Sequence, residues 1–171
     1  MPLIIEDGSI VAGADSYISL DDARTLAAAY GLTLPTDDTA AEVALRNGVF
    51  YVDSYESSLK GCRVGDSQSL AWPRSGVYRF GFLLANNTVP EDVKRAQVFA
   101  AVEIAAKGDA WGTDDGKSVA SEAVSGAVSV SYFNTGKSGT SYKIKRADNA
   151  MLPLLASGAA QLSVGRGGYG Y

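Results

Sequence analysis

Histidine is absent from this 171-residue sequence, and cysteine occurs once, at Cys62. A catalytic zinc site usually needs histidine, and a structural zinc site normally needs four cysteine or histidine ligands. Nucleophile systems that depend on an imidazole base are excluded as well. A single cysteine cannot form a disulfide within the chain, which suits folding in the cytoplasm. We therefore predict no metal, no cofactor and no enzymatic activity.

Long apolar runs and clustered positive charge are also scarce. No segment approaches the ~20 apolar residues that a membrane helix needs, and the first residues, MPLIIEDGSIVAG, lack the basic start and apolar run of a signal peptide. The net charge is −4, and the 15 basic residues are scattered except for Lys143, Lys145 and Arg146. Because nucleic-acid affinity usually depends on clustered Lys and Arg, tight DNA binding is disfavoured.

Apolar periodicity and capping residues predict four helices. Ser19 is a suitable N-cap for the first, and Thr39 with Glu42 forms a capping-box pattern for the second. Gly48 inside the second helix indicates close packing by a neighbouring backbone. The third is apolar nearly all round in its second half, so we expect it to be the central core helix. The expected helices cover about 19–30, 39–59, 88–107 and 148–157.

Between and after these helices the sequence changes character. The segment 60–87 is irregular and rich in aromatic residues and arginine, which is typical of a functional loop. Alternating small and β-branched residues predict a strand arm over about 118–133, bent at Gly126. The end, 158–171, is rich in glycine and tyrosine and is expected to be flexible. We predict a mainly α fold: a small bundle of three to four helices over 1–157 with a β-hairpin or extended strand arm and a flexible C-terminal tail.

Two segments imitate a phosphate-binding P-loop but lack its context. Gly136-Lys137-Ser138 ends such a motif without the leading glycine, and 112–118 has one spacer residue too few. Neither stands between a strand and a helix, as the motif requires. The pairs Asp21-Asp22, Asp37-Asp38 and Asp114-Asp115 could hold a divalent cation. A helix-capping or loop position explains these pairs better.

The group Trp72-Pro73-Arg74 has two interpretations. Trp72 can anchor the long loop to the helices, or the group can belong to an interface, where tryptophan and arginine dominate binding energy. Arg166 with Tyr169 and Tyr171 is similar to one repeat of an RNA-binding tail. A terminal arm that orders on a protein partner explains this segment equally well.

Four motifs in order resemble the head-tail connector proteins of tailed bacteriophages: LIIEDGSIVAGADSYISLDDA, LAWPRSGVY, VPEDVKRAQ and SEAVSGAVSVSYF. The resemblance runs from Leu3 to about Leu155 and does not reach the Gly/Tyr-rich end. It implies a non-enzymatic structural adaptor in the virion neck that is assembled in the cytoplasm of the bacterial host cell and forms a ring, expected to have twelve copies, below the portal. Its expected partners are the portal protein and a stopper or tail-completion protein, and DNA would pass through the lumen without specific binding.

Relatives of this kind are often labelled DnaT-like, so a single-stranded DNA-binding or replication-accessory protein is the alternative. A carboxylate-bound metal enzyme is a third hypothesis. For the adaptor, 71–78 is expected to be the loop between helices and 121–133 the strand arm. The residues expected to contact other subunits or partners are Trp72, Arg74, Tyr78, Arg79, Val128, Val130, Tyr132, Phe133, Arg166, Tyr169 and Tyr171.

Overall fold

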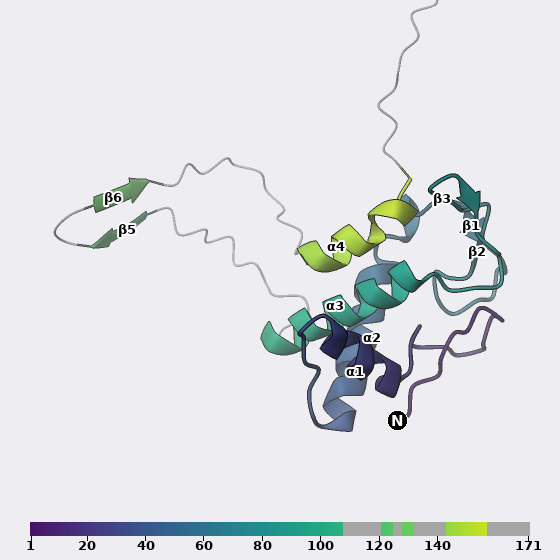
Figure 1. Cartoon of the computed structure of the whole chain (residues 1–171), viewed down its shortest axis with the longest axis horizontal. Helices are drawn as coiled ribbons and strands as arrows, with labels where there is room; N and C mark the ends of the chain where they lie inside the picture. Colours follow the sequence, from purple (N-terminus) through teal and green to yellow (C-terminus); the bar gives the residue numbers. More distant parts are fainter. Residues whose placement is uncertain (108–120, 125–127, 132–142, 157–171) are drawn as a thin grey trace, which may run out of the picture.

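Four α-helices and six short strands form the part of the chain that the structure describes (Figure 1). This computed structural model describes residues 1–107, 121–124, 128–131 and 143–156. The helices are α1 (Leu20–Ala29), α2 (Asp38–Asp53), α3 (Glu91–Lys107) and α4 (Lys145–Met151), with the short 3-10 helices η1 (Glu56–Ser58) and η2 (Leu152–Leu154).

The strands form three separate antiparallel pairs, which are β1 (Cys62–Arg63) with β2 (Arg74–Ser75), β3 (Tyr78–Arg79) with β4 (Phe82–Leu83), and β5 (Ser121–Val124) with β6 (Val128–Ser131). The β5–β6 pair falls inside the strand arm predicted over 118–133, with Ser121 opposite Ser131. The described chain is thus mainly helical with small hairpins, which confirms the predicted fold at that level. The predicted tail and both P-loop imitations lie outside the described residues.

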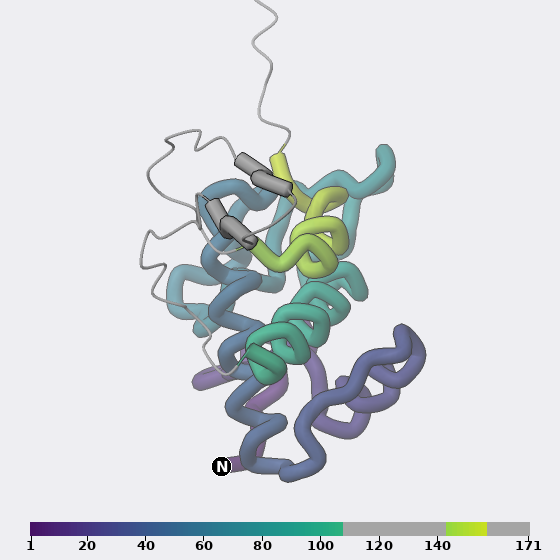
Figure 2. The backbone as a smooth tube through the Cα atoms, turned by 90° about the vertical axis from the view of Figure 1, so that its left-hand side faces the viewer, coloured from purple at the N-terminus to yellow at the C-terminus, as the bar shows by residue number. Residues whose placement is uncertain are grey.

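The centre of the fold is the contact between α2 and α3, which lie side by side in both views (Figure 1 and Figure 2). At Gly48 of α2, an added Cβ atom would lie 2.4 Å from the carbonyl oxygen of Gln97 in α3. The buried Gln97 amide donates to the carbonyl oxygen of Leu45 at 3.1 Å. Eight of the 17 residues of α3 are buried. The close packing at Gly48 and the central position of the third helix are therefore confirmed.

The start of α1 agrees with the prediction, whereas α2 differs at both ends. Ser19 caps α1 by accepting the N–H of Asp22 at 3.2 Å. Asp37, not Thr39, caps α2 by accepting the N–H of Ala40 at 2.8 Å, which is consistent with the similar capping strength of Asp. The helix expected to reach residue 59 ends at Asp53. There the Ser54 hydroxyl donates to the Tyr51 carbonyl at 2.6 Å and competes with the helical ladder.

The third and fourth helices also differ from their predicted bounds. α3 begins three residues later than expected because the Thr88 hydroxyl donates to the Ala85 carbonyl and caps no helix. The helix expected over 148–157 begins at Lys145 and ends at Met151. It gives way to η2, where Pro153 has no N–H to continue the α-helical ladder.

Tyrosine hydroxyl groups in and just after α2 bind Asp148 of α4, which lies more than 90 residues later in the sequence. The hydroxyl groups of Tyr51 and Tyr55 each donate to one carboxylate oxygen of Asp148, both at 2.6 Å. The Tyr51 oxygen also accepts the backbone N–H of Ile144 at 2.7 Å. Burial and the Asp148 carboxylate raise the pKa of both tyrosines, so the hydroxyls stay protonated donors. These bonds fix the start of α4 against the core.

The irregular segment between η1 and α3 is held by its own buried side chains. Trp72 is 1% exposed and lies in the main hydrophobic core. The buried Arg74 guanidinium donates to the carbonyl oxygens of Lys60 and Gly61 at 2.9 and 2.8 Å, so its charge is placed among acceptors. Trp72 therefore anchors the loop to the helices, as its first interpretation expected, whereas Arg74 holds the loop together from within.

An ion pair closes the base of this loop. Arg63 donates to both carboxylate oxygens of Glu56, at 2.5 and 2.7 Å. These hydrogen bonds lower the pKa of Glu56 below its ordinary value. At the end of α2, burial raises the pKa of Asp53, whose carboxylate accepts a hydrogen bond from the Tyr17 hydroxyl.

Among the described residues, none of the helices combines the length and the apolar character that a membrane span requires.

Candidate functional site

Charge is divided unevenly along the chain. Residues 1–59 carry ten acidic residues against two arginines, a net charge of −8, whereas residues 60–171 carry thirteen basic against nine acidic residues, a net charge of +4. Although the basic residues are not contiguous in sequence, nearly all of them lie in the second segment. The prediction of scattered basic residues therefore missed a segregation that the overall charge of −4 hides.

Basic and aromatic side chains of the second segment meet in an open depression between α3 and α4. One cavity of about 500 Å³ is lined by Arg95, Phe99 and Arg146, together with Tyr30 from the end of α1. A second cavity of about 410 Å³ shares Phe99 and Arg146 and continues to Lys143 and Lys145. The two cavities adjoin at Phe99 and Arg146, and together they are called here the α3–α4 groove.

Fewer of the basic residues that line the groove are in ion pairs than of the acidic ones. Lys143, Lys145 and Arg146 are exposed, and none forms an ion pair with another described residue. In contrast, the acidic lining residue Glu103 is paired with Lys107 at 2.8 Å. The other, Asp92, is paired with Arg79. The groove therefore presents an excess of unpaired positive charge.

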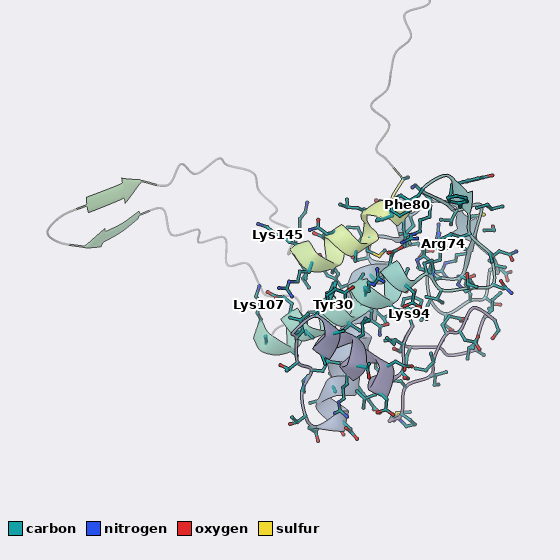
Figure 3. All side chains as sticks on the ribbon, in the orientation of Figure 1. Tyr30, Arg74, Phe80, Lys94, Lys107 and Lys145 are labelled. Atoms are coloured by element: carbon teal, nitrogen blue, oxygen red, sulfur yellow. The ribbon has the colours of Figure 1, made fainter. Side chains whose placement is uncertain are left out.

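Two aromatic rings form one wall of the groove. Tyr30 meets Phe99 edge to face, with ring centroids 5.0 Å apart and an interplanar angle of 89°. Tyr30 is 47% exposed, so part of its ring remains open to solvent. Figure 3 shows Lys145 at the start of α4 and Tyr30 close to α3. A flat ring beside unpaired cations is the combination that binds an anionic chain with planar groups.

The β3–β4 hairpin lies next to one end of the groove. Arg79 of β3 pairs with the groove residue Asp92, and its guanidinium carbon lies 4.8 Å from the centroid of the Phe80 ring. In Figure 3, Phe80 lies beyond the end of α4 opposite Lys145. The hairpin therefore extends the basic and aromatic surface past the groove itself.

The structure separates the residues predicted to contact partners. Tyr78 and Arg79 belong to the hairpin beside the groove, whereas Trp72 and Arg74 are buried and hold the loop. Val128 and Val130 lie in β6. The remaining predicted residues lie outside the described ranges: Tyr132, Phe133, Arg166, Tyr169 and Tyr171.

Sequence reasoning missed the residues that line the centre of the groove. Arg95, Phe99 and Tyr30 were seen only as members of helices, because their convergence needs the packing of α1 and α4 on α3. The sequence did contain one signal for the groove, the tight group of Lys143, Lys145 and Arg146. That group marks the basic end of the groove.

The aspartate pairs lie elsewhere. Asp22 and Asp37 belong to the N-terminal ends of α1 and α2, where they complement the helix dipole. Within the described residues, no three Cys, Asp or Glu side chains gather closely enough to hold a metal ion. Asp114-Asp115 lies outside those residues.

Fold and groove together define a small, mainly helical protein with a basic, aromatic surface beside one helix pair. The chain belongs to the family described as "Putative DnaT-like ssDNA binding protein", whose model matches residues 1–167. No curated protein and no solved structure is similar enough to match.

The family match corrects the identification as a head-tail connector. The matched family is the DnaT-like one, it spans nearly the whole chain, and it replaces the virion adaptor that the four motifs implied. The resemblance was wrong because the motifs reflect features that many folds share, such as a helix start, a buried tryptophan or a small-residue strand. The portal and stopper partners and the place in the virion stay predictions.

Proposed function

We propose that this protein binds single-stranded DNA along the α3–α4 groove. One observation carries the proposal: Arg146 lines both cavities of the groove, with the Tyr30 ring in one and Lys143 and Lys145 in the other. None of these three cations forms an ion pair with another described residue. Proteins that bind single strands combine a positive groove, which follows the phosphates, with aromatic rings on which bases stack. The family description supports the same class of ligand.

The overall negative charge does not contradict this proposal. Local phosphate contacts decide nucleic-acid affinity, and exposed charges more than about 10 Å apart are largely screened at moderate salt. The acidic residues are concentrated in 1–59, whereas the groove cations belong to 60–171. We expect moderate affinity that weakens steeply as salt is added.

The proposed role is binding without a chemical step. No histidine is present to act as a general base, and the groove carboxylates are engaged in ion pairs with Arg79 and Lys107. We therefore also propose that the protein is not an enzyme. A replication-accessory role would follow from strand binding, and self-association remains a separate prediction.

Fluorescence anisotropy with a labelled oligothymidylate tests the proposal. If Lys143, Lys145, Arg146 and Arg95 each meet a phosphate, log K should fall against log salt with a slope of about −3, since each contact on a single strand contributes about −0.7. Exchange of Arg146 to glutamate should weaken binding about tenfold, because it removes one contact and adds repulsion.

Arg24→Glu is the matched control. Arg24 lies in α1, pairs with Asp38 at 2.8 Å and does not line the groove, yet its exchange changes the net charge equally. We expect less than a twofold effect on binding. No measurable binding by the folded wild type at low salt, or equal losses in the two variants, would refute the proposal.

A further inference from the structure

We infer that the β3–β4 hairpin is a platform on which unpaired bases stack, and that it makes the groove selective for single strands. This inference rests on the proposed function. It assigns a role to the exposed aromatic side chains Tyr78, Phe80 and Phe82, which the groove alone does not use.

The hairpin exposes its large apolar side chains. Phe80 is 72% exposed, Phe82 77% and Tyr78 57%. Tyr78 lies opposite Leu83, and Arg79 lies opposite Phe82. Since opposed residues share a face of an antiparallel pair, both faces of this short hairpin carry an aromatic ring. Burial in the core of the protein does not explain these rings.

The turn itself favours a different residue. Phe80 and Gly81 both have positive φ, 51° and 87°, as the two central residues of a type I′ turn do. Asn-Gly is the preferred sequence there, and a bulky residue at positive φ is an unfavourable exception. Phe80 therefore places an exposed ring at the tip of the hairpin at the cost of local backbone strain. Such strain is typical of sites that contact a ligand.

Two sets of contacts join the hairpin to the groove. Arg79 pairs with Asp92, which lines the groove at its α3 side. Lys60 donates to the carbonyl oxygens of Tyr78 at 3.3 Å and of Pro153 at 2.7 Å, and Pro153 also lines the groove. The hairpin is thus linked to two residues that line the groove, so a strand bound there would have the hairpin as its neighbour.

The chemistry of the hairpin favours bases over a protein partner. The Arg79 guanidinium, which is paired with Asp92, lies over one face of the Phe80 ring, and the ring is 72% exposed, so aromatic surface remains open to a base. Each nucleotide supplies a phosphate for the groove cations and a base for an aromatic ring, and stacking tolerates any base. In a duplex the base faces are already stacked, so only an unpaired strand can use the rings.

The test compares three ligands of equal length: oligothymidylate, an oligomer of the same backbone with abasic sites, and a duplex. We expect the wild type to bind oligothymidylate roughly 5- to 100-fold more tightly than the abasic oligomer, the range for one stacked base. The double variant F80N/F82T should lose most of this preference, with abasic binding unchanged, because only Tyr78 and Tyr30 remain to stack on bases. The preference for oligothymidylate over the duplex should decrease in parallel.

These exchanges keep the hairpin foldable. Asn-Gly suits the type I′ turn and threonine suits a strand, so the variant should melt at or above the wild-type temperature. Val43→Ala is the control, since Val43 is an exposed apolar residue of α2 outside the groove, and it should leave all three affinities unchanged.

The outcomes separate this inference from the proposed function. If none of the ligands binds, the proposed function fails, and the inference fails with it. If the wild type binds oligothymidylate and the variant keeps the same preference over the abasic oligomer, the inference alone is overturned. If the variant also sediments as a smaller species than the wild type, the hairpin is instead a contact between copies of the chain.

Discussion

The segments 1–59 and 60–171 differ in net charge and in what they contribute to the core and to the groove. The first carries a net charge of −8 and contributes α1 and α2, whereas the second carries +4 and contributes α3, α4 and the hairpin. The first supplies half of the core but only Tyr30 and Leu32 to the groove. The net charge of the whole chain, −4, therefore describes neither segment. DNA binding has to be judged from the charges on the surface that each segment exposes.

The contact that joins the two segments is the most sensitive to a small change. Ala is favoured over Gly in a helix by about 1 kcal/mol, so propensity alone predicts that Gly48→Ala stabilises the protein. A Cβ 2.4 Å from the Gln97 carbonyl predicts the reverse, a loss of about 2–3 kcal/mol. Urea unfolding measures the difference. A higher midpoint for the variant would show that α2 and α3 are not packed this closely.

Adding positive charge to the acidic segment should have little effect on DNA binding, even when the net charge of the protein changes by four units. Asp21 and Asp38 lie in the first turns of α1 and α2, so D21K/D38K raises the net charge from −4 to 0. We expect oligothymidylate affinity to rise less than threefold at 0.15 M salt, because screened distant charges contribute little. An increase of tenfold or more would mean that total charge, not the groove, governs binding.

The tyrosine bonds that fix α4 to α2 should support the groove indirectly. Tyr51→Phe removes the donor to Asp148 and the acceptor for the Ile144 N–H. We expect a loss of about 1–2 kcal/mol in the free energy of unfolding, because the N–H is left unsatisfied. Oligothymidylate affinity should fall two- to threefold as Lys145 and Arg146 lose their fixed position.

Tyr30→Phe is the matched control for that exchange. It removes a hydroxyl from the groove wall while it keeps the ring, so stability and affinity should stay close to those of the wild type. If Tyr51→Phe destabilised the protein without any effect on affinity, the positions of the α4 cations would not depend on α2.

The smallest effect concerns acid stability at the boundary of the two segments. Arg63 lowers the pKa of Glu56, so this carboxylate stabilises the fold above its ordinary value of 4.5 and loses that contribution as the pH falls through the lowered pKa. In Glu56→Gln, thermal stability should therefore fall less between pH 6 and pH 3 than in the wild type. A parallel fall in both proteins would show that the Arg63 pair does not contribute.

Elements with strong local signals could be predicted, and boundaries set by competing contacts could not. The Ser19 cap and the close approach at Gly48 follow from residue type alone. The early end of α2 depends on the Ser54 hydroxyl, and the position of α4 depends on tyrosines about 90 residues away in sequence. A local side-chain hydrogen bond decided the end of α2 and tertiary hydrogen bonds decided the position of α4, because local propensity differs little there.

The sequence by itself determined that this is a mainly helical chain with a central apolar helix, no imidazole and a single thiol, at Cys62. It also held the charge segregation, which is visible only when the two segments are counted separately. Only the tertiary structure brought Tyr30, Arg95, Phe99 and Arg146 to one groove and buried Trp72 and Arg74. The physical reason is that helix periodicity fixes which side of a helix is apolar, whereas packing alone fixes which polar residues of different helices become neighbours.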